Sequence, residues 1–331
     1  MSTTNPITST VPFEKDGTFH GFLRLPHSRE DSAWGMIQIP ISVIRNGQGP
    51  TALFTGANHG DEYEGPIALQ SLAHDLRAED ISGCVIIIPY MNYPAFRAAK
   101  RLSPLDGGNM NRIFPGKPDG TPTQKIADYI LSQLVPMADI VLDFHSGGKS
   151  LDFLPFAAAH LLENKTQEAA CIAAMEAFAA PYSMILNEID SVGMYDTAVE
   201  AEGKVFVTTE LGGGSSATAR SAGIARRGAE NLLRHAGITP GVPDVAPTIR
   251  IDTSENGCFH FAPCDGMLEM CVDLGDRVAT GQPLARIWST GHSGRAPEVV
   301  SSTQSGILAA RHFPGLIQSG DCLAVVAQLT D

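Results

Sequence analysis

Apolar residues gather in short runs that recur along the first 240 or so residues of the chain. Two of the runs are apolar at almost every position, which is typical of strands buried on both faces of a parallel sheet. The others lead into loops that carry polar residues. We predict strands at Trp34–Arg45, Thr51–Ala57, Cys84–Pro89, Asp139–Phe144 and Lys204–Thr209.

Between these runs the spacing of apolar residues favours helices. We predict one that starts at Gly65-Pro66, and others over Thr123–Leu134, Leu161–Ala179 and Ala217–His235. The stretch Asn92–Pro118 is rich in Pro, Gly and Asn and is predicted to be a long loop. Strands that alternate with helices predict an α/β domain over residues 1–240, with a mainly parallel mixed sheet flanked by helices.

The pattern changes after Thr239–Pro247, which is predicted to be a linker. Residues 247–331 show short alternating runs and turn residues, and Asp265–Leu268 is echoed by Ser305–Leu308 at an offset of about 40 residues. Two such halves resemble the barrel-sandwich fold of lipoyl and biotinyl domains. The last lysine is Lys204, so this all-β segment lacks the lysine that such carriers modify. We expect it to be structural, either covering a site or forming a dimer contact.

Composition excludes several classes of function. The chain has 36 Asp and Glu against 23 Lys and Arg, a formal net charge of -13, which argues against binding nucleic acid or an anionic membrane. It has no apolar run long enough to span a bilayer and no signal-peptide pattern at its start. Its six cysteines lack paired spacing. We therefore expect reduced thiols and a cytoplasmic protein.

Candidate metal ligands follow two predicted strands. His59 and Glu62 lie three residues apart in the loop after Thr51–Ala57, and His145 ends the run Asp139–Phe144. Two imidazoles, one carboxylate and a water are a known zinc hydrolase arrangement. Taken alone, the His59–Glu62 spacing is more often an ordinary polar pair at a helix start. Asp143 lies on the same side of its strand as His145, and either orients that histidine or caps a neighbouring loop.

Five motifs, in this order, resemble the succinylglutamate desuccinylase/aspartoacylase family, which is related to the zinc carboxypeptidases. They are GANHGDE (56–62), NYPAFRAAKR (92–101), NMNRIFPG (109–116), DFHSG (143–147) and TELGG (209–213), within residues 50–240. The resemblance implies a zinc-carboxypeptidase-like domain that binds one Zn²⁺ through His59, Glu62 and His145. It also implies that Glu210 is the general base, that Arg101 polarises the scissile carbonyl, and that Asn111 and Arg112 hold a substrate α-carboxylate.

Physical chemistry is compatible with these roles. A carboxylate beside a metal can move a proton from water to a leaving amine, and a guanidinium can grip a carboxylate through two hydrogen bonds. Solvated loop arginines and a salt-bridged strand-end glutamate are the alternatives. The segment between Arg101 and Asn111 is longer than is usual in the family, with the excess in Leu102–Gly108, which makes the position of Arg101 the less secure of the two arginines.

The stretch Tyr195–Glu202 predicts the class of substrate. Relatives that act on acidic groups carry an arginine about ten residues before the base glutamate, whereas this stretch offers Asp196, Glu200 and Glu202 and no arginine. A site with these acids should prefer an N-acetylated amino acid with a cationic side chain. Tyr195 and Glu200 are the candidate contacts; the alternative is that the acids face solvent.

Three other functions stay open at this point. A deacylase for another N-acyl amino acid or a carboxypeptidase-like enzyme would use the same residues. A non-catalytic binding protein would retain the fold but not every catalytic residue, and none is missing here. A phosphate-binding loop at Gly212–Gly214 lacks its lysine, so these glycines are expected to serve a close backbone approach or a sharp turn. A homodimer is expected from the family.

Overall fold

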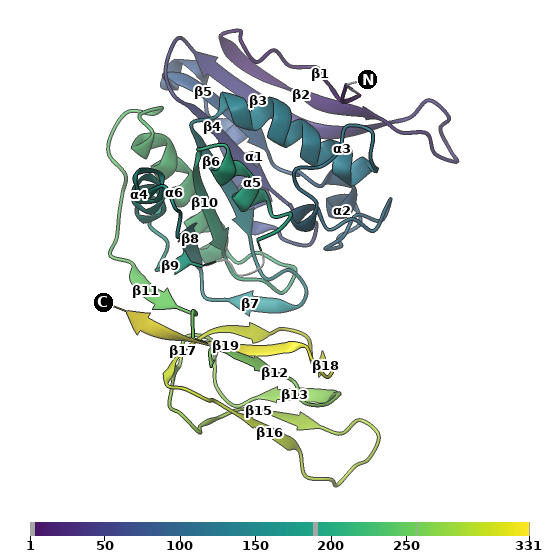
Figure 1. Cartoon of the computed structure of the whole chain (residues 1–331), viewed down its shortest axis with the longest axis vertical. Coiled ribbons are helices and arrows are strands. Elements are labelled where there is room, and N and C mark those ends of the chain that lie inside the picture. Colours follow the sequence, from purple (N-terminus) through teal and green to yellow (C-terminus); the bar gives the residue numbers. More distant parts are fainter. Residues whose placement is uncertain (1–3, 188–190, 256, 331) are drawn as a thin grey trace.

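Four strands form the parallel centre of the main sheet (Figure 1). The structure is a computed structural model that describes residues 4–187, 191–255 and 257–330. These central strands are, in spatial order, β5 (Gly83–Ile88), β4 (Thr51–Gly56), β6 (Ile140–His145) and β10 (Val205–Glu210). Strands β5 and β6 are buried at every position. The predicted strands in this region are confirmed to within one or two residues.

Antiparallel strands extend this centre on both sides. On one side lie β3 (Met36–Asn46), β2 (Gly17–Pro26) and β1 (Thr8–Ser9), and on the other β8 (Phe156–His160) runs antiparallel to β10 and is followed by β9 (Tyr182–Leu186). The sheet is therefore mixed, because β8 and β9 pair parallel to each other but run antiparallel to the four central strands. The mixed sheet flanked by helices is as predicted, but antiparallel pairs make up more of it than the prediction of a mainly parallel sheet implied.

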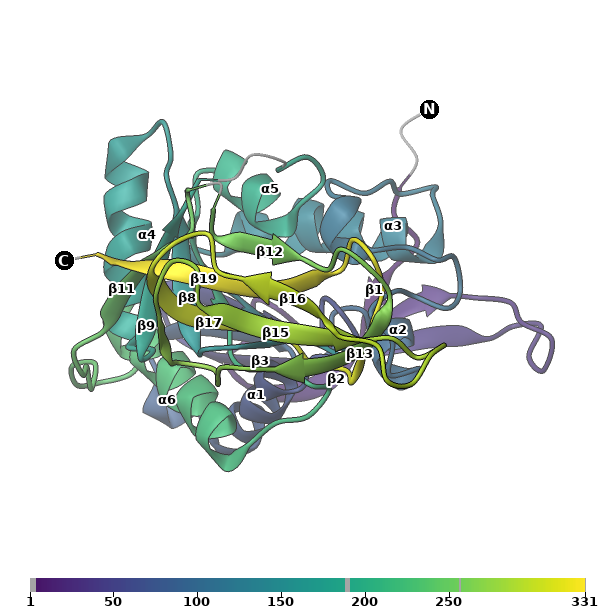
Figure 2. The ribbon, with the colours of Figure 1, turned by 90° about the horizontal axis from the view of Figure 1, so that it is seen from below.

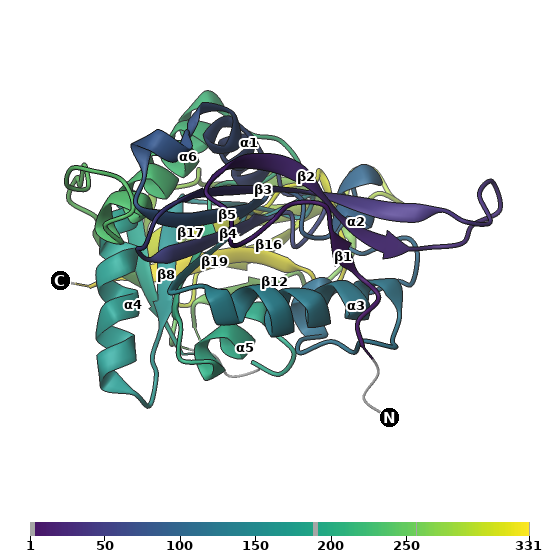
Figure 3. The ribbon, with the colours of Figure 1, turned by 90° about the horizontal axis from the view of Figure 1, so that it is seen from above.

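Helices cover both faces of the sheet (Figure 3). Helices α1 (Glu64–Asp75), α4 (Lys165–Phe178) and α6 (Ala219–His235) share one apolar core with one face. Helices α3 (Pro122–Tyr129) and α5 (Tyr195–Ala201) share a second core with the other face. The face covered by α5 carries the polar strand ends, so this side of the sheet holds the candidate site.

Several predicted helix limits are wrong. Helix α4 starts at Lys165 rather than Leu161, because β8 runs to His160 and the Asn164 side chain caps the helix. Helix α3 ends at Tyr129 and continues as a π turn (130–134) and a 3-10 turn (135–137), so Pro136 lies inside the last turn. The predicted loop Asn92–Pro118 contains α2 (Tyr93–Arg97) and a 3-10 turn at Met110–Arg112.

The C-terminal strands form two sheets that share one apolar core (Figure 2). The smaller, antiparallel sheet has the order β16 (Glu298–Ser301), β15 (Pro283–Trp288), β13 (Gly266–Met270), β18 (Leu316–Ile317). The other is continuous with the main sheet: β11 (Ile249–Asp252) pairs with β9, and beyond β11 lie β19 (Cys322–Thr330), β17 (Gly306–His312) and β14 (Arg277–Val278). Strand β12 (Phe259–Phe261) pairs with β19, and β7 (Leu151–Phe153) pairs with β17.

The segment after residue 247 was predicted to be all-β, and its described residues contain strands but no helix. All six cysteines are free thiols, as predicted. Among the described residues there is no helix whose length and hydropathy would suit it to crossing a bilayer.

Candidate metal centre and active-site cavity

The candidate metal ligands come from the ends of two adjacent central strands. His59 and Glu62 lie in the loop between β4 and α1, and His145 is the last residue of β6. At Gly60 this loop passes against α2 so closely that a Cβ would lie 2.0 Å from the carbonyl carbon of Ala95. Glycine is therefore required there, and the close approach holds the loop that carries His59 and Glu62.

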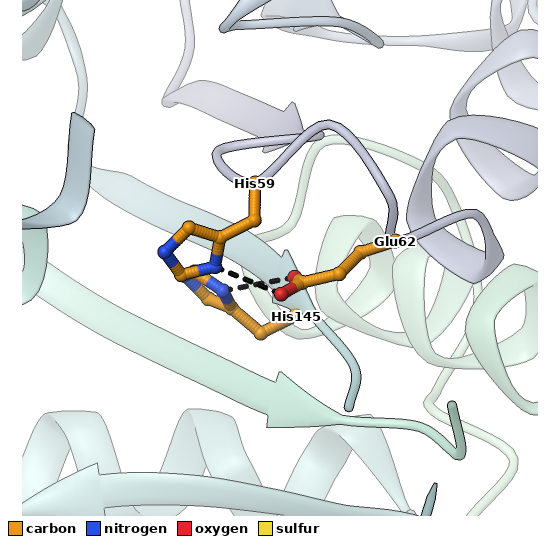
Figure 4. A group of neighbouring side chains, drawn as sticks. All are labelled: His59, Glu62 and His145. Carbon is orange, nitrogen blue, oxygen red and sulfur yellow. Dashed lines mark hydrogen bonds and ion pairs between the residues drawn. The ribbon is translucent and has the colours of Figure 1, made fainter. Parts of the chain in front are cut away.

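Both imidazoles direct Nδ1 at the Glu62 carboxylate (Figure 4). His59 Nδ1 lies 2.8 Å from Glu62 Oε1, and His145 Nδ1 lies 3.1 Å from Oε2. One ligand atom from each residue lies within 4.8 Å of the other two, and all three side chains are buried or nearly so. Among the residues that the structure describes, this is the one group with such geometry.

Outer partners fix the orientation of both histidine rings. His145 Nε2 lies 2.9 Å from Asp143 Oδ2, and His59 Nε2 lies 3.2 Å from Asn109 Oδ1. Asp143 is itself held by the Asn58 amide, which donates to Oδ2 at 3.0 Å. With the outer nitrogens donating, both Nδ1 atoms are free to bind a cation.

The ionisable groups of this cluster shift one another's pKa values. Burial acts to raise the pKa of Glu62, but His59 and His145 hold it well below its usual range. Burial acts to lower the pKa of His145, but Asp143 and Glu62 raise it well above its usual range. Burial lowers the pKa of His59, against the effect of Glu62. A buried carboxylate anion between two imidazoles is a suitable environment for a divalent cation.

Glu210 lies beside this group. It is the last residue of β10, in register with His145, and its Oε2 atom is buried with no hydrogen-bond partner. Burial, and secondarily the charge of Glu62, raises its pKa to about 8. Arg101 also reaches the group, with Nη1 3.6 Å from Glu62 Oε1, and its side chain is 48% exposed. The structure thus brings both predicted catalytic residues to the three candidate ligands.

Asn111 and Arg112 lie on the 3-10 turn next to this group. The Asn111 Oδ1 accepts the backbone N–H of Tyr195 at 3.0 Å, which leaves its amide N–H groups as donors. Gly193 packs on this turn, where a Cβ would lie 2.4 Å from the Arg112 carbonyl oxygen. Its φ is +81°, a conformation that favours glycine. The segment before α5 therefore positions the turn that carries Asn111 and Arg112.

These residues line a cavity of about 270 Å³. The predicted ligands, Glu210, Arg101, Asn111 and Arg112 all border it. Asp196 borders it too, and the C-terminal strands contribute part of the wall. The remaining lining residues are Phe153, Phe156, Met184, Leu186, Met194, Thr208, Thr253, Phe259, Ala309, Ala310 and Val325. A larger groove of about 710 Å³ lies over β2 and β3, away from the candidate metal ligands.

Two predicted contacts do not border the cavity. The Tyr195 ring is fully buried and stacks on Phe114, with ring centroids 4.7 Å apart. Glu200 is buried and its Oε1 lies 2.8 Å from His160 Nδ1. Tyr195 therefore contacts the lining residue Asn111 through its backbone, and Glu200 contacts His160, which lies 3.8 Å from Asp196.

The predicted glycine turn has the expected close approach. Gly212 accepts the N–H groups of Gly147 and Phe153 through its carbonyl oxygen, at 2.9 and 3.1 Å. A Cβ on Gly213 would lie 1.9 Å from the Leu151 carbonyl oxygen. The glycine run thus packs directly on the segment that follows His145.

A family model for the succinylglutamate desuccinylase/aspartoacylase catalytic domain matches residues 48–236. The chain belongs to this family. This member is 50% identical, over 99% of its own length and 96% of the relative's, to the N-alpha-acetyl-L-2,4-diaminobutyric acid deacetylase of Halomonas elongata.

Two solved structures match almost the whole length of this chain. A structure described as a succinylglutamate desuccinylase from a Silicibacter species matches with a TM-score of 0.97 and 59% identity, over 98% of this chain and 99% of that chain. The product-bound ectoine utilization protein EutE (DoeB) of Ruegeria pomeroyi matches with the same TM-score, identity and coverage. The resemblance read from the five motifs is therefore confirmed.

Several residues at the site were not assigned by sequence reasoning. Asn58 and Asn109 lie within the quoted motifs, but no periodicity marks them as partners of Asp143 and His59. His160 lies in none of the quoted motifs. Of the acids in Tyr195–Glu202 the sequence pointed to Glu200, whereas Asp196 is the one that borders the cavity among the described lining residues.

Proposed function

We propose that this protein is a metal-dependent deacetylase that converts N-α-acetyl-L-2,4-diaminobutyrate to acetate and L-2,4-diaminobutyrate in ectoine catabolism. The observation that carries the proposal is the full-length 50% identity to a deacetylase of that name, together with an intact His59, Glu62, His145 and Glu210 around one cavity. The sequence favours the same substrate, because its acidic stretch suits a cationic side chain.

We propose zinc as the metal. Two imidazole nitrogens and one carboxylate oxygen, converging within 4.8 Å and leaving one side open to the cavity, fit the ligand set of catalytic zinc. Bound zinc would supply Lewis acidity, polarising an amide carbonyl and acidifying a water. Asp143 and Asn109 would hold the two histidines in the ligating tautomer.

The other residues supply binding and proton transfer. Arg112 and the amide of Asn111 would hold the α-carboxylate of the substrate. Arg101 would stabilise the oxyanion that develops on the acetyl oxygen, a contribution of roughly 3–4 kcal/mol if it equals that of other oxyanion donors. Glu210 would accept a proton from water and donate it to the leaving nitrogen.

We propose a division into a catalytic domain (1–240) and a C-terminal domain (247–331) of the lipoyl-like barrel-sandwich kind. The two packed C-terminal sheets support this fold, and the contribution of Phe259, Ala309 and Val325 to the cavity supports a site-covering role. A homodimer and a cytoplasmic location stay predictions.

The test is a comparison of substrates with metal analysis. We expect kcat/KM to be highest for N-α-acetyl-L-2,4-diaminobutyrate, and lower for N-acetyl-L-aspartate and N-succinyl-L-glutamate. Chelator-treated protein should be inactive and regain activity with one equivalent of Zn²⁺. A higher kcat/KM for either acidic substrate would favour the alternative, a deacylase of aspartoacylase or desuccinylase type; release of C-terminal residues from peptides would favour a carboxypeptidase.

A further inference from the structure

One face of the sheet carries Glu210, Thr208 and Phe156, which border the cavity. Glu210 lies opposite Phe156, and Thr208 lies opposite Ala158. Side chains alternate along a strand, so His160 of β8 points to this same face. At about 3.3 Å per residue, its Cα lies about 13 Å along the strand from Phe156. His160 therefore lies further along the face that carries Glu210 and Thr208.

Asp196 lies beside His160 and borders the cavity. It is the second residue of α5, is 6% exposed, and borders the cavity. Its Oδ2 atom lies 3.8 Å from His160 Nε2, and its Oδ1 atom accepts the backbone N–H of Thr197. Oδ2 has no closer partner among the described residues, so a lone pair of a buried carboxylate is available at the cavity.

Acidic side chains gather around Asp196. Asp196 and Glu200 both approach the one imidazole of His160, at 3.8 and 2.8 Å. Among the described contacts of His160, two carboxyl groups thus meet one imidazole. The lining elsewhere is different: Glu62 and Glu210 lie at the metal ligands, and Arg101 and Arg112 are cations. Among the described lining residues, Asp196 is the one acid remote from the candidate ligand group.

We propose that the Asp196 carboxylate binds the side-chain ammonium of the substrate and so determines its specificity, with Glu200 and His160 as positioning residues behind it. This inference rests on the proposed function. In N-α-acetyl-L-2,4-diaminobutyrate the α-nitrogen is acylated, so the side-chain ammonium is the one cation. It lies five bonds from the acetyl carbonyl carbon, roughly 6 Å with ordinary bond lengths. Glu210 and Asp196 both border the cavity in which a substrate of this span would lie.

The physical reason for specificity is the cost of an unmatched charge. An ammonium that enters a cavity walled by Phe156, Met184 and Leu186 loses its hydration and requires an anion in exchange. An acidic side chain in the same place would face Asp196 as a like charge. The same residue would therefore select diaminobutyrate derivatives and reject N-acetylaspartate.

The competing explanation is that Asp196 merely stabilises the first turn of α5 through its bond to Thr197. The experiment that separates the two is a cycle of two proteins and two substrates. Wild-type and Asp196→Asn proteins are assayed on N-α-acetyl-L-2,4-diaminobutyrate and on N-acetyl-L-norvaline, which has a methyl group in place of the ammonium. We expect the substitution to lower kcat/KM about 100-fold for the first substrate and to change it by only a few-fold for the second.

Two further variants control for charge and folding. Glu202→Gln removes the same charge from an exposed residue at the end of α5 and should leave both substrates unaffected. Asp196→Glu retains the carboxylate, and should keep the preference for the cationic substrate even where its rate falls. As a readout independent of turnover, calorimetry should show that Asp196→Asn weakens binding of L-2,4-diaminobutyrate but not of L-norvaline.

Equal losses on the two substrates, or no loss on either, would overturn the inference while leaving the proposed function intact. Loss of the preference in Asp196→Glu would also overturn it. A wild-type protein with no activity on N-α-acetyl-L-2,4-diaminobutyrate would overturn the proposed function, and this inference with it.

Discussion

Glu62 is the residue on which the candidate metal centre converges. Each of its oxygens contacts a different imidazole, at 2.8 and 3.1 Å, and the carboxylate is buried. Glu210, in contrast, borders the same cavity, and its buried Oε2 atom has no hydrogen-bond partner among the described residues. Substitution of the two glutamates should therefore affect metal binding and activity differently.

We expect Glu62→Ala to lose both metal and activity, and Glu210→Gln to lose activity alone. Removal of a direct ligand should lower metal affinity by more than the ~100-fold that loss of an outer partner costs. Loss of a general base should lower kcat by roughly 10²–10⁴-fold with the metal retained. Elemental analysis and steady-state kinetics on both variants check this. Glu62→Ala protein with full metal content would contradict the assignment, as would active Glu210→Gln protein.

The metal ligands were predictable because their signal is local. An apolar run predicts each strand. The polar residue that follows the run lies at the end of the strand, where open α/β sheets bind ligands. Asp196 and His160 lack such a signal. His160 ends the run Phe-Ala-Ala-Ala-His, whose composition suits a helix as well as a strand, and Asp196 acquires its place only when α5 packs across the sheet.

At the scale of elements, the turn after β10 depends on glycines that no side chain can replace. Gly213 has φ +157°, and its Cβ would lie 1.9 Å from the Leu151 carbonyl oxygen. A Cβ added to Gly223 of α6, in contrast, would have no other atom within 4 Å. The first glycine is thus required by a backbone contact, and the second only loosens its helix.

We expect Gly213→Ala and Gly223→Ala to change stability in opposite directions. The first should lower the free energy of unfolding by at least ~2 kcal/mol, because two backbone segments must separate. The second should raise it by about 0.5–1 kcal/mol, because alanine restricts the unfolded chain and favours helix. Chemical denaturation of both variants measures the two effects. A stable Gly213→Ala protein would show that the approach to Leu151 is unimportant.

Strand β12 contains a histidine that is held neutral. His260 is buried; its Nδ1 lies 3.1 Å from the Cys258 carbonyl oxygen, and its Nε2 accepts the N–H of Thr303 at 3.0 Å. These partners assign the proton to Nδ1. Burial lowers the pKa of His260 below its ordinary value of 6.5. A second proton would have to sit on Nε2, against the Thr303 N–H.

The sign of the resulting pH dependence follows from linkage. Below about pH 6.5 the unfolded chain binds a proton at His260 that the folded chain does not, so stability falls as pH falls toward 5. We expect Tm to drop less steeply between pH 7 and 5 in His260→Gln protein than in wild type. His292→Gln, at an exposed position, is the matched control and should keep the wild-type slope. Equal slopes in all three proteins would contradict the buried neutral state.

At the scale of the whole molecule, residues from the α/β part and from the β-rich C-terminal part line the same cavity. The change in pattern near Thr239–Pro247 was visible in the sequence, and so were the β-rich segment and its repeat. The continuity of the sheet through β11 and β19 was not, because pairing of Ile249 with Tyr182 and of Arg250 with Thr330 joins segments far apart in sequence. No local pattern encodes such a register.

This continuity determines how the protein should unfold. One apolar cluster joins Leu154, Phe156 and Met184 of the first part to Ile307 and Ala309 of the second. A separate cluster, which includes Leu284, lies wholly between the two C-terminal sheets. Because the first cluster and the shared sheet link the two parts, we expect a single cooperative calorimetric transition rather than two.

Substitutions in the two clusters test that expectation. Ile307→Ala acts on the joining cluster and Leu284→Ala on the C-terminal one, and each should cost about 2–5 kcal/mol. If the parts are coupled, both variants lower the Tm of the same transition, and loss of activity on heating follows it in both. If the C-terminal part unfolds independently, Leu284→Ala produces a separate early transition while the rest of the molecule melts as before. In that case the cavity would lose the wall that Ala309, Ala310 and Val325 provide, and activity would disappear at the early transition. The C-terminal part would then unfold without the rest of the molecule.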